Sequence, residues 1–497
     1  MKFDTLDDLV SGSARRWPDR TALLDENGRR LSYQNLEAWV NAFSHRLAKL
    51  GAESGARVAI LSRNSFESVA AYFALLKAGA VVVWLNQTLG AKDLGLVCKD
   101  AEISVLLCEE EFKGRAEKIS EACGVKIEAL NKFKNTPEEN RNFKSFSRPE
   151  GLAAIVYTSG STDKPLGVML THRNLLSNNE AIAAYLNLNE NDRVCCVLPF
   201  YYIYGLSLLL SHVAAGGSVF MENRFSYPQA ALEAMETQKV TGFSGVSSHF
   251  ILLMNHTDFL SRKLPALRYF THAGDKMPVA VTEKILKAFP RKPLFLMYGQ
   301  TEAAPRISYL DPSLAGKKPA SAGKALKNIE MKILKDNEAP CAVGEEGEIV
   351  IRGENVMKGY WNNPKETQKV LRKGWLFTGD TGYLDADGDL FVTGRLKQFI
   401  KVGGRRVSPA EVESLALGYP GVREAAVVGI PDETLGEKLR LYATEDVTQP
   451  VNTAALADFY KKKAPFYKVP AEIVIVAALP RNGQGKIDRK RLAGMKG

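Results

Sequence analysis

Cysteine is scarce in this chain, and its few cysteines follow no pattern of metal ligation. Six are spread over 497 residues, and only Cys195 and Cys196 are adjacent, inside an apolar run typical of a buried strand. Two Cys-x-x-Cys pairs, the usual signature of a structural zinc site, are missing. We therefore expect reduced thiols in the core of a cytoplasmic protein, because disulfides are rare in that compartment.

Long apolar runs and basic blocks are lacking as well. The most apolar window, residues 69–85, is interrupted by Lys77 and Gly79 and so predicts a core helix and strand, with no membrane span. The first residues are too acidic and polar for a secretion signal. The net charge of +10 is modest for this length, and no basic run is interleaved with aromatics. Nucleic acid is therefore not an expected partner.

Alternating strand and helix patterns fill the first 300 residues. Helical spacing of apolar residues at 35–50 and 65–78 accompanies buried-strand runs at 57–61 and 81–85. Such alternation predicts parallel sheets covered by helices. Shorter alternating runs with glycine follow, such as residues 347–352, and indicate a smaller β-rich layer.

The last hundred residues predict a compact α+β domain. A strand at 388–394 ends in a turn, and Ser408-Pro-Ala-Glu411 predicts a helix start with a capping box. Strand patterns at 422–428 and 471–476 flank a helical segment.

A hydroxyl-rich loop follows a strand pattern at residues 155–167, Ile-Val-Tyr-Thr-Ser-Gly-Ser-Thr-Asp-Lys-Pro-Leu-Gly. Its small side chains leave backbone N–H groups accessible and add hydroxyl donors, which suits a polyphosphate. The loop lacks the Gly-Lys-Ser/Thr of a Walker motif. A helix beginning at Thr171 is expected directly after it.

This loop resembles the signature of adenylate-forming enzymes, a superfamily that contains acyl- and aryl-CoA synthetases, amino-acid adenylation domains and luciferases. Further matching segments occur in the family's order and cover nearly the whole chain. They are Tyr298-Gly-Gln-Thr-Glu302, Gly347-Glu-Ile-Val350, Gly359-Tyr-Trp-Asn362, Trp375-Leu-Phe-Thr-Gly-Asp380, Gly394-Arg-Leu-Lys397, residues 404–413, residues 419–427 and Gly485-Lys486.

The resemblance implies a fold, an activity and two domains. A large domain (1–396) of parallel sheets with a β-rich subdomain would bind ATP and the acid, and a small mobile α+β domain (397–497) would follow it. The implied activity forms an acyl-AMP from a carboxylic acid with Mg²⁺-ATP, releases pyrophosphate, and passes the acyl group to a thiol.

The resemblance also assigns roles to individual residues. Lys486 would bridge the carboxylate and the α-phosphate, Asp380 would accept the ribose hydroxyls with help from Arg395, and Glu302 would hold Mg²⁺ beside Thr301. Lys397 would be the hinge, and Gly403 and Gly404 would line the tunnel for the thiol donor. The remaining nucleotide contacts would be Thr158, Ser159, Gly160, Ser161, Thr162, Lys164, Ala273, Gly274, Asp275, Tyr298, Gly299 and Gln300.

The phosphate loop departs from the family pattern at two positions. Asp163 stands where glycine is usual, and Leu166 stands where lysine is usual. A carboxylate near the β- and γ-phosphates is repulsive, and Lys164 would have to compensate. The departure leaves open a degenerate, weakly catalytic nucleotide-binding protein.

The acid is expected to be apolar. Residues 199–210 contain no carboxylate that would pair with the ammonium of an amino acid, and an unpaired buried ammonium is costly. An aliphatic or aromatic acid fits better. The candidate acyl pocket consists of Tyr202, Ile203, Val246, His272 and Met297, with Phe243 and His249 as further candidates.

The acceptor is either CoA or the phosphopantetheine of a separate carrier protein. We favour CoA because Arg405 and Arg406 suit its phosphates. A stand-alone enzyme that loads a carrier protein is the alternative, and oligomeric state is not readable from the sequence.

Overall fold

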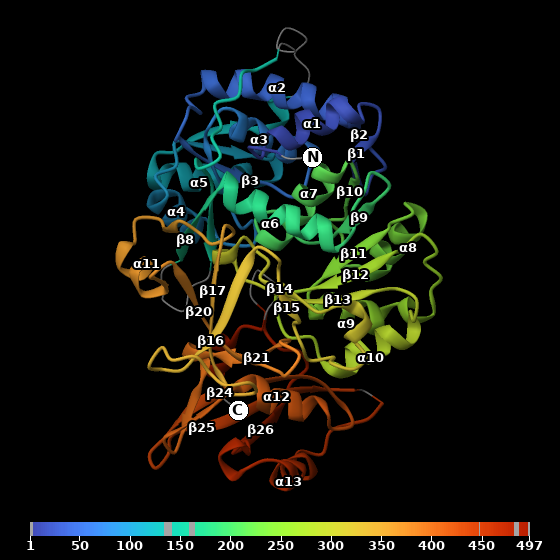
Figure 1. Cartoon of the computed structure of the whole chain (residues 1–497), viewed down its shortest axis with the longest axis vertical. Coiled ribbons are helices and arrows are strands. Elements are labelled where there is room, and N and C mark those ends of the chain that lie inside the picture. Colours follow the sequence, from blue (N-terminus) through green and yellow to red (C-terminus); the bar gives the residue numbers. More distant parts are fainter. Residues whose placement is uncertain (1–2, 134–141, 159–164, 447, 482–486, 496–497) are drawn as a thin grey trace.

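The computed structural model describes residues 3–133, 142–158, 165–446, 448–481 and 487–495. Within these ranges the strands form four sheets, two large and two small. Figure 1 shows the large sheets in the upper part of the molecule and the last small sheet at the bottom. This arrangement confirms the expected α/β class with a β-rich subdomain and a small C-terminal domain.

The first large sheet is mostly parallel and carries the middle of the chain. Its described strands follow the order β15-β14-β13-β12-β11-β9-β10-β1-β2, and the pairs from β13 to β1 are parallel. The bounds are Lys324–Ala325, Ser308–Tyr309, Leu294–Tyr298, Tyr269–His272, Gly242–Gly245, Arg193–Cys196, Ser218–Met221, Thr21–Asp25 and Arg30–Ser32.

The second large sheet carries the predicted phosphate loop. Its described strands follow the order β18-β8-β7-β4-β3-β5-β6, parallel from β7 to β6. The bounds are Gly359–Tyr360, Leu166–Thr171, Leu152–Thr158, Val81–Trp84, Arg57–Leu61, Val105–Cys108 and Lys126–Ala129. The strands predicted at 57–61 and 81–85 are thus confirmed as β3 and β4.

One hydrophobic core joins the two large sheets. It contains apolar residues from one face of each sheet and from the helices between them, α1 (Asp8–Arg16), α2 (Tyr33–Lys49), α3 (Phe66–Lys77), α6 (His172–Tyr185) and α7 (Ile203–Ala215). α3 and α7 are buried along nearly their whole length, as an all-apolar helix must be. α2 and α3 confirm the helices predicted from apolar spacing.

Other helices cover the outer faces of the sheets. α8 (Pro228–Thr237), α9 (Ser247–His256) and α10 (Val279–Ala288) pack on the first sheet, and α4 (Ala91–Asp100) and α5 (Lys113–Cys123) pack on the second. No helix in the described ranges has the length and apolarity needed to cross a membrane.

The β-rich layer is an antiparallel sheet. It consists of β16 (Ile329–Leu334), β17 (Gly347–Gly353), β20 (Trp375–Leu384), β19 (Leu371–Arg372) and β21 (Leu390–Arg395), with α11 (Pro364–Val370) beside it. The strand predicted at 347–352 is β17. The strand predicted to end in a turn at residue 394 instead continues as β21 to Arg395, paired with β20.

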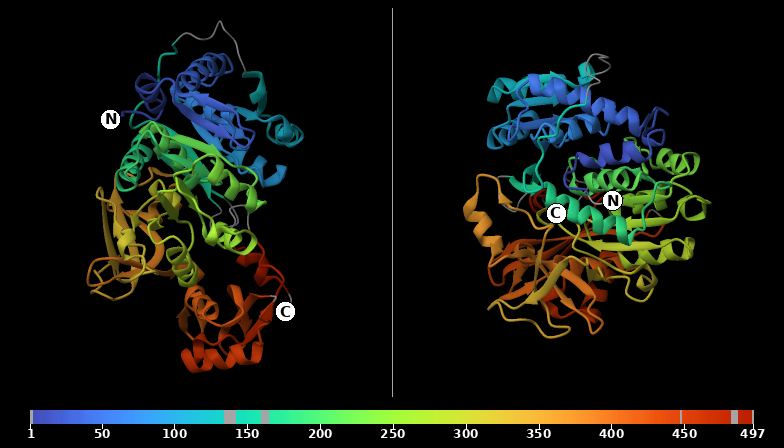
Figure 2. Two further views of the ribbon diagram at one scale, coloured as in Figure 1. Left: turned by 90° about the vertical axis from the view of Figure 1, so that its right-hand side faces the viewer. Right: turned by 45° about the horizontal axis from the view of Figure 1, so that its top comes forward.

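The C-terminal part forms its own sheet and cores at one end of the molecule (Figures 1 and 2). The sheet contains β22 (Ile400–Val402), β23 (Arg405–Val407), β24 (Val422–Asp432), β25 (Gly436–Glu445) and β26 (Glu472–Ile475). Its helices are α12 (Pro409–Leu417), α13 (Thr453–Lys463) and α14 (Arg489–Ala493).

One predicted detail of this domain is wrong. α12 begins at Pro409 after Ser408, as expected, but the Ser408 side chain does not cap the helix. Its hydroxyl donates to the carbonyl of Thr393 on β21 (2.7 Å). The predicted capping box is therefore replaced by a contact to the preceding sheet, which a local sequence pattern cannot reveal.

Candidate active site

Predicted nucleotide residues gather where β13 ends. Tyr298 is the last residue of β13, and the short 3₁₀ helix η5 (Thr301–Ala303) follows. The backbone N–H of Met357 donates to the carbonyl of Glu302 (2.9 Å) just before β18 pairs with β8. The carboxyl end of a parallel strand thus meets the second sheet, the usual place for a ligand in such folds.

Asp380 accepts two side-chain hydrogen bonds at this point. Tyr298 donates its phenolic O–H to Oδ2 of Asp380 (2.7 Å), and Arg395 donates from Nε to Oδ1 (2.5 Å). Asp380 and Arg395 are direct partners on β20 and β21, and Asp380 is only 5% exposed. Each carboxylate oxygen keeps a second lone pair, so Asp380 can still accept two hydroxyl groups of a ligand.

The charges at this contact reinforce each other. The negative charge of Asp380 raises the pKa of Arg395. Burial, together with Asp380, raises the pKa of Tyr298 well above its usual value. Tyr298 therefore stays a neutral donor, and the arginine stays a cation, throughout the physiological range of pH.

Glu302 is oriented by a residue that sequence reasoning missed. The phenol of Tyr360 on β18 donates to Oε1 of Glu302 (2.9 Å). Burial, together with the nearby carboxylate of Glu302, raises the pKa of Tyr360. A half-buried carboxylate held through one oxygen suits a hard cation at the other, so the donor chemistry fits Mg²⁺. The motif Gly359-Tyr-Trp-Asn362 marks this segment in the sequence, but the motif alone does not indicate the role of its tyrosine.

Gly299 and Thr301 lie against a tight turn in the next segment. A Cβ atom on Gly299 would stand 1.8 Å from the carbonyl oxygen of Pro305, so a larger side chain is excluded there. Thr301 is 9% exposed, at the start of η5. Both predicted residues thus lie in a rigid connection between Tyr298 and Glu302.

Asp275 ties the end of β12 to the start of α9. Its Oδ1 accepts hydrogen bonds from the backbone N–H of Ser247 (3.1 Å), lies 2.9 Å from the Ser247 hydroxyl and 3.0 Å from Nε2 of His272. Burial alone would raise the pKa of Asp275, but the contacts with His272 and Ser247 have the larger combined effect, and the pKa is lowered. Ser247 was not predicted, because nothing in its neighbourhood in sequence marks it.

The predicted acyl-pocket residues divide between two faces of the first sheet. Met297 faces the core that contains α7, whereas His272, paired with Leu296, points to the opposite face toward Ser247. A Cβ on Gly274 (φ +104°) would meet the Tyr202 hydroxyl at 2.9 Å and a Val246 methyl at 3.1 Å. Tyr202, Val246 and Gly274 therefore line one wall.

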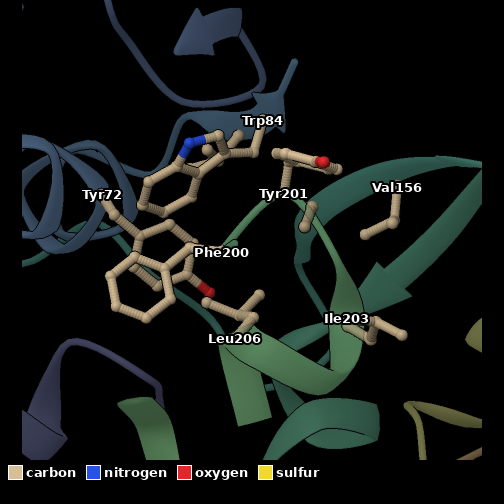
Figure 3. A pocket seen from close by; sticks show the side chains of 9 residues that line it. Tyr72, Trp84, Val156, Phe200, Tyr201, Ile203 and Leu206 are labelled. Carbon is tan, nitrogen blue, oxygen red and sulfur yellow. The ribbon is translucent and has the colours of Figure 1, made fainter. Parts of the chain in front are cut away.

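Ile203 lies elsewhere, in an apolar pocket. Figure 3 shows it with Tyr72, Trp84, Val156, Phe200, Tyr201 and Leu206 around the pocket. Its free volume is only about 10 Å³, enough for about one water molecule, so these side chains nearly fill it. Val156 belongs to β7, two residues before Thr158. Among the further candidates, Phe243 is fully buried in the core beside the first sheet, and burial lowers the pKa of His249 to about 4.

The phosphate loop is described at its two ends. β7 and β8 are antiparallel neighbours, and Thr158 pairs with Leu166. Leu166 begins β8 and packs, half-buried, against the core between the large sheets. The predicted residues Ser159, Gly160, Ser161, Thr162 and Lys164, and the unusual Asp163, lie outside the described residues.

The predicted C-terminal residues are partly described. Gly403 and Gly404 form a two-residue hairpin turn between β22 and β23, with φ of +56° and +77°. Positive φ at both central positions explains these glycines without a ligand. Lys397 lies in the 3₁₀ turn η7 (Leu396–Gln398) that joins β21 to the last domain.

Lys486 lies outside the described residues, but both ends of its segment are placed. Arg481 forms a β-bridge with Ile487. The positive charge of Arg481 also contributes to the low pKa of His249 on α9.

Two family models match the chain. The model of the AMP-binding enzyme matches residues 10–361, and that of the AMP-binding enzyme C-terminal domain matches residues 411–486. The first match contains Tyr298, Glu302 and Tyr360, and the second ends at Lys486.

Characterised proteins are similar over nearly the whole length. A 2-succinylbenzoate–CoA ligase of Geobacillus sp. (strain WCH70) is 34% identical over 96% of this chain and 94% of its own. A feruloyl-CoA synthase of Amycolatopsis sp. is 33% identical over 95% of both chains.

A solved relative carries the reaction intermediate. The o-succinylbenzoate CoA synthetase of Bacillus subtilis, in complex with its acyl-adenylate, is 31% identical, covers 98% of both chains and superposes with a TM-score of 0.89. The same protein with ATP and magnesium is 32% identical over 97% of this chain and 98% of its own, with a TM-score of 0.88.

Proposed function

We propose that this chain, which belongs to the AMP-binding enzyme family and is an ATP-dependent carboxylate–CoA ligase, acts on an acid with an apolar aliphatic or aromatic body. It would convert the acid and ATP to acyl-AMP and pyrophosphate, and then transfer the acyl group to CoA. The observation that carries the nucleotide site is the pair of hydrogen bonds that Tyr298 and Arg395 donate to Asp380.

The polar residues would bind and orient the nucleotide. Asp380 would accept the ribose hydroxyls, and the ring of Tyr298 would lie beside the base. Glu302, held by Tyr360, would present its free oxygen to Mg²⁺, which reduces the repulsion between an attacking carboxylate and the phosphates. Lys486 would add a positive charge at the α-phosphate.

The acid would lie along the wall of Tyr202, Val246 and Gly274, toward Met297. No carboxylate is present in residues 199–210 to hold an ammonium group. Relatives that act on 2-succinylbenzoate and on ferulate support an aromatic body for the acid.

We also propose two domains, 1–396 and 397–497, with Lys397 as the pivot. The last domain has separate hydrophobic cores made of residues after 399. The hydrogen bond from Ser408 to Thr393 would have to break when this domain rotates. A cytoplasmic location fits six cysteines that are all free, four of them buried.

Acid-dependent release of pyrophosphate tests the proposal. A panel of aliphatic and aromatic acids is offered with Mg²⁺-ATP, and CoA is then compared with a holo-carrier protein as the acceptor. Asp380→Asn should raise KM for ATP about 10-fold or more, because hydrogen bonds to a charged group contribute about 1.5–3 kcal/mol.

Asp387→Asn is the matched control, since Asp387 is exposed on the next turn and contacts Lys318. Failure of every acid to release pyrophosphate would favour the degenerate nucleotide-binding protein instead. Transfer to the carrier protein alone would favour the loading enzyme.

A further inference from the structure

β20 contains a bulge at Asp380, where it pairs with β17 in the β-rich layer (Figure 1). The register shifts between Glu348 and Val350, so that Ile349 alone lies opposite residues 378–380. A bulge bends its strand and changes the direction of a side chain, and bulges are frequent next to active sites. The bulge therefore determines where the carboxylate of Asp380 points.

Three hydrogen bonds fix the backbone of this bulge. Oε1 of Glu348 accepts from the backbone N–H of Gly379 (3.0 Å). The hydroxyl of Thr378 donates to the carbonyl of Ile349 (2.7 Å) and accepts from the backbone N–H of Asp380 (3.1 Å). The neighbouring strand thus anchors the bulge with one of its carbonyls and with the carboxylate of Glu348.

Gly379 makes this anchor necessary. Its φ is +71°, and a Cβ atom there would meet no described atom within 4 Å, so the glycine is required for its backbone conformation and not for space. Glycine is the least restricted residue, and the peptide that leads into Asp380 can turn unless it is held. The contact from the Gly379 N–H to Glu348 restricts this freedom.

The carboxylate of Glu348 is kept in an unfavourable place. It is half-buried, and burial and the negative charges of Asp380 and Asp336 raise its pKa, against the opposing effects of the Gly379 N–H and of Arg372. Two carboxylates on neighbouring strands repel each other. This cost calls for a role of Glu348 that is linked to Asp380.

The contacts of Asp380 divide into two kinds. Tyr298 and Arg395 hold the carboxylate itself, whereas Glu348 holds the peptide that precedes it. A carboxylate offers its remaining lone pairs in a fixed direction only when its backbone is also fixed. Such preorganisation lowers the cost of ordering the site when a ligand binds.

We propose that Glu348 is a positioning residue for the nucleotide, which holds the N–H of Gly379 and so directs the Asp380 carboxylate toward the two ribose hydroxyls. The inference rests on the role given to Asp380 in the proposed function. It adds a residue that touches no substrate and that determines how strongly ribose is distinguished from deoxyribose.

Calorimetric binding of Mg²⁺-ATP, 2′-deoxy-ATP and 3′-deoxy-ATP tests this role and needs no acid. We expect the wild type to bind ATP about 10-fold more tightly than either deoxy nucleotide, because the missing hydroxyl is a partner of a charged group. In Glu348→Ala the preference should fall to roughly 3-fold or less, mainly through weaker binding of ATP. Loss of a merely structural residue would lower stability without changing this preference.

Two further variants separate the acceptor oxygen from the bulk of the side chain. Glu348→Gln keeps an acceptor for the Gly379 N–H and should retain most of the preference. Glu348→Leu keeps the apolar packing without the acceptor, and it replaces the alanine variant if that variant does not fold. Glu330→Ala is the matched control, since Glu330 is an exposed acid on β16 that pairs with Arg352, and it should bind as the wild type does.

A wild-type preference in folded Glu348→Ala or Glu348→Leu would overturn the inference. Equal binding of ATP and its deoxy analogues by the wild type would also overturn it, and this comparison needs no variant. In both cases acid-dependent release of pyrophosphate would leave the proposed ligase activity standing. Loss of the preference in Glu348→Ala, in a protein that releases pyrophosphate with no acid, would remove the ligase activity and support the role of Glu348.

Discussion

Tyr360 donates a hydrogen bond of 2.9 Å to Oε1 of Glu302, a residue 58 positions earlier in the chain. The contact joins the second large sheet to the end of β13 in the first. The geometry of Glu302 therefore depends on how the two large sheets meet, and a change in that junction would reach the proposed Mg²⁺ ligand directly.

Removal of the Tyr360 hydroxyl should slow adenylation. In Tyr360→Phe we expect a roughly 10-fold lower rate of pyrophosphate exchange and a higher requirement for Mg²⁺, because a hydrogen bond to a charged group contributes about 1.5–3 kcal/mol. Tyr383→Phe, on β20 and stacked on Phe391, is the control and should behave as the wild type. A Mg²⁺ titration identical to the wild type would show that Tyr360 does not orient Glu302.

The sequence predicted what depends on local pattern. Apolar periodicity identified α2, α3, β3 and β4, because each buries a face that its own residues define. Asp380 and Arg395 were found together because they lie on consecutive antiparallel strands within recognised motifs. Contacts between distant segments were not predictable in this way.

Three residues illustrate that limit. Tyr360 belongs to a two-residue strand, too short to show a period, and its role comes from pairing with β8. Arg306 lies in none of the recognised motifs, and its burial, to 2% exposed, follows from contacts with Asn178 of α6 and Tyr204 of α7. Ser408 donates to Thr393 in place of capping α12, because tertiary structure offers a competing acceptor.

The free energy of unfolding should fall as the pH is lowered from about 6.5 to 4, and protonation of His212 should account for part of this fall. Burial lowers the pKa of this fully buried histidine to about 4, from an ordinary value of 6.5. Between these values the unfolded chain binds a proton that the folded protein does not. This one histidine therefore lowers the free energy of unfolding by at most about 1.4 kcal/mol for each pH unit.

Urea unfolding of His212→Asn at pH 7.5 and pH 5 checks this point. The variant should be less stable at pH 7.5, since His212 is hydrogen-bonded to Leu208 and Tyr269, but should lose less stability on acidification. His172, whose pKa burial also lowers to about 4, should preserve part of the pH dependence. If the variant and the wild type lose the same free energy of unfolding between pH 7.5 and pH 5, His212 is protonated in the folded state.

Proline at position 397 should separate the two half-reactions. Lys397→Pro fixes φ in the turn η7, which stiffens the proposed pivot. Adenylation should persist, and transfer of the acyl group to CoA should fall about 10-fold or more. Lys397→Ala removes the side chain without fixing φ and should retain both activities. Full thioester synthesis by the proline variant would contradict rotation about this residue.

Removal of the Lys486 charge should affect the first half-reaction alone. A positive charge at the α-phosphate offsets repulsion between the attacking carboxylate and the phosphates, a need that ends once pyrophosphate has left. Lys486→Ala should therefore lower adenylation by at least ~10²- to 10³-fold, the usual effect of one transition-state donor. Thioester formation from supplied acyl-AMP and CoA should remain near the wild-type rate. Lys490→Ala, on α14, controls for charge lost in the same region. Equal losses in both half-reactions would show that Lys486 supports the structure of the C-terminal domain and takes no direct part in adenylation.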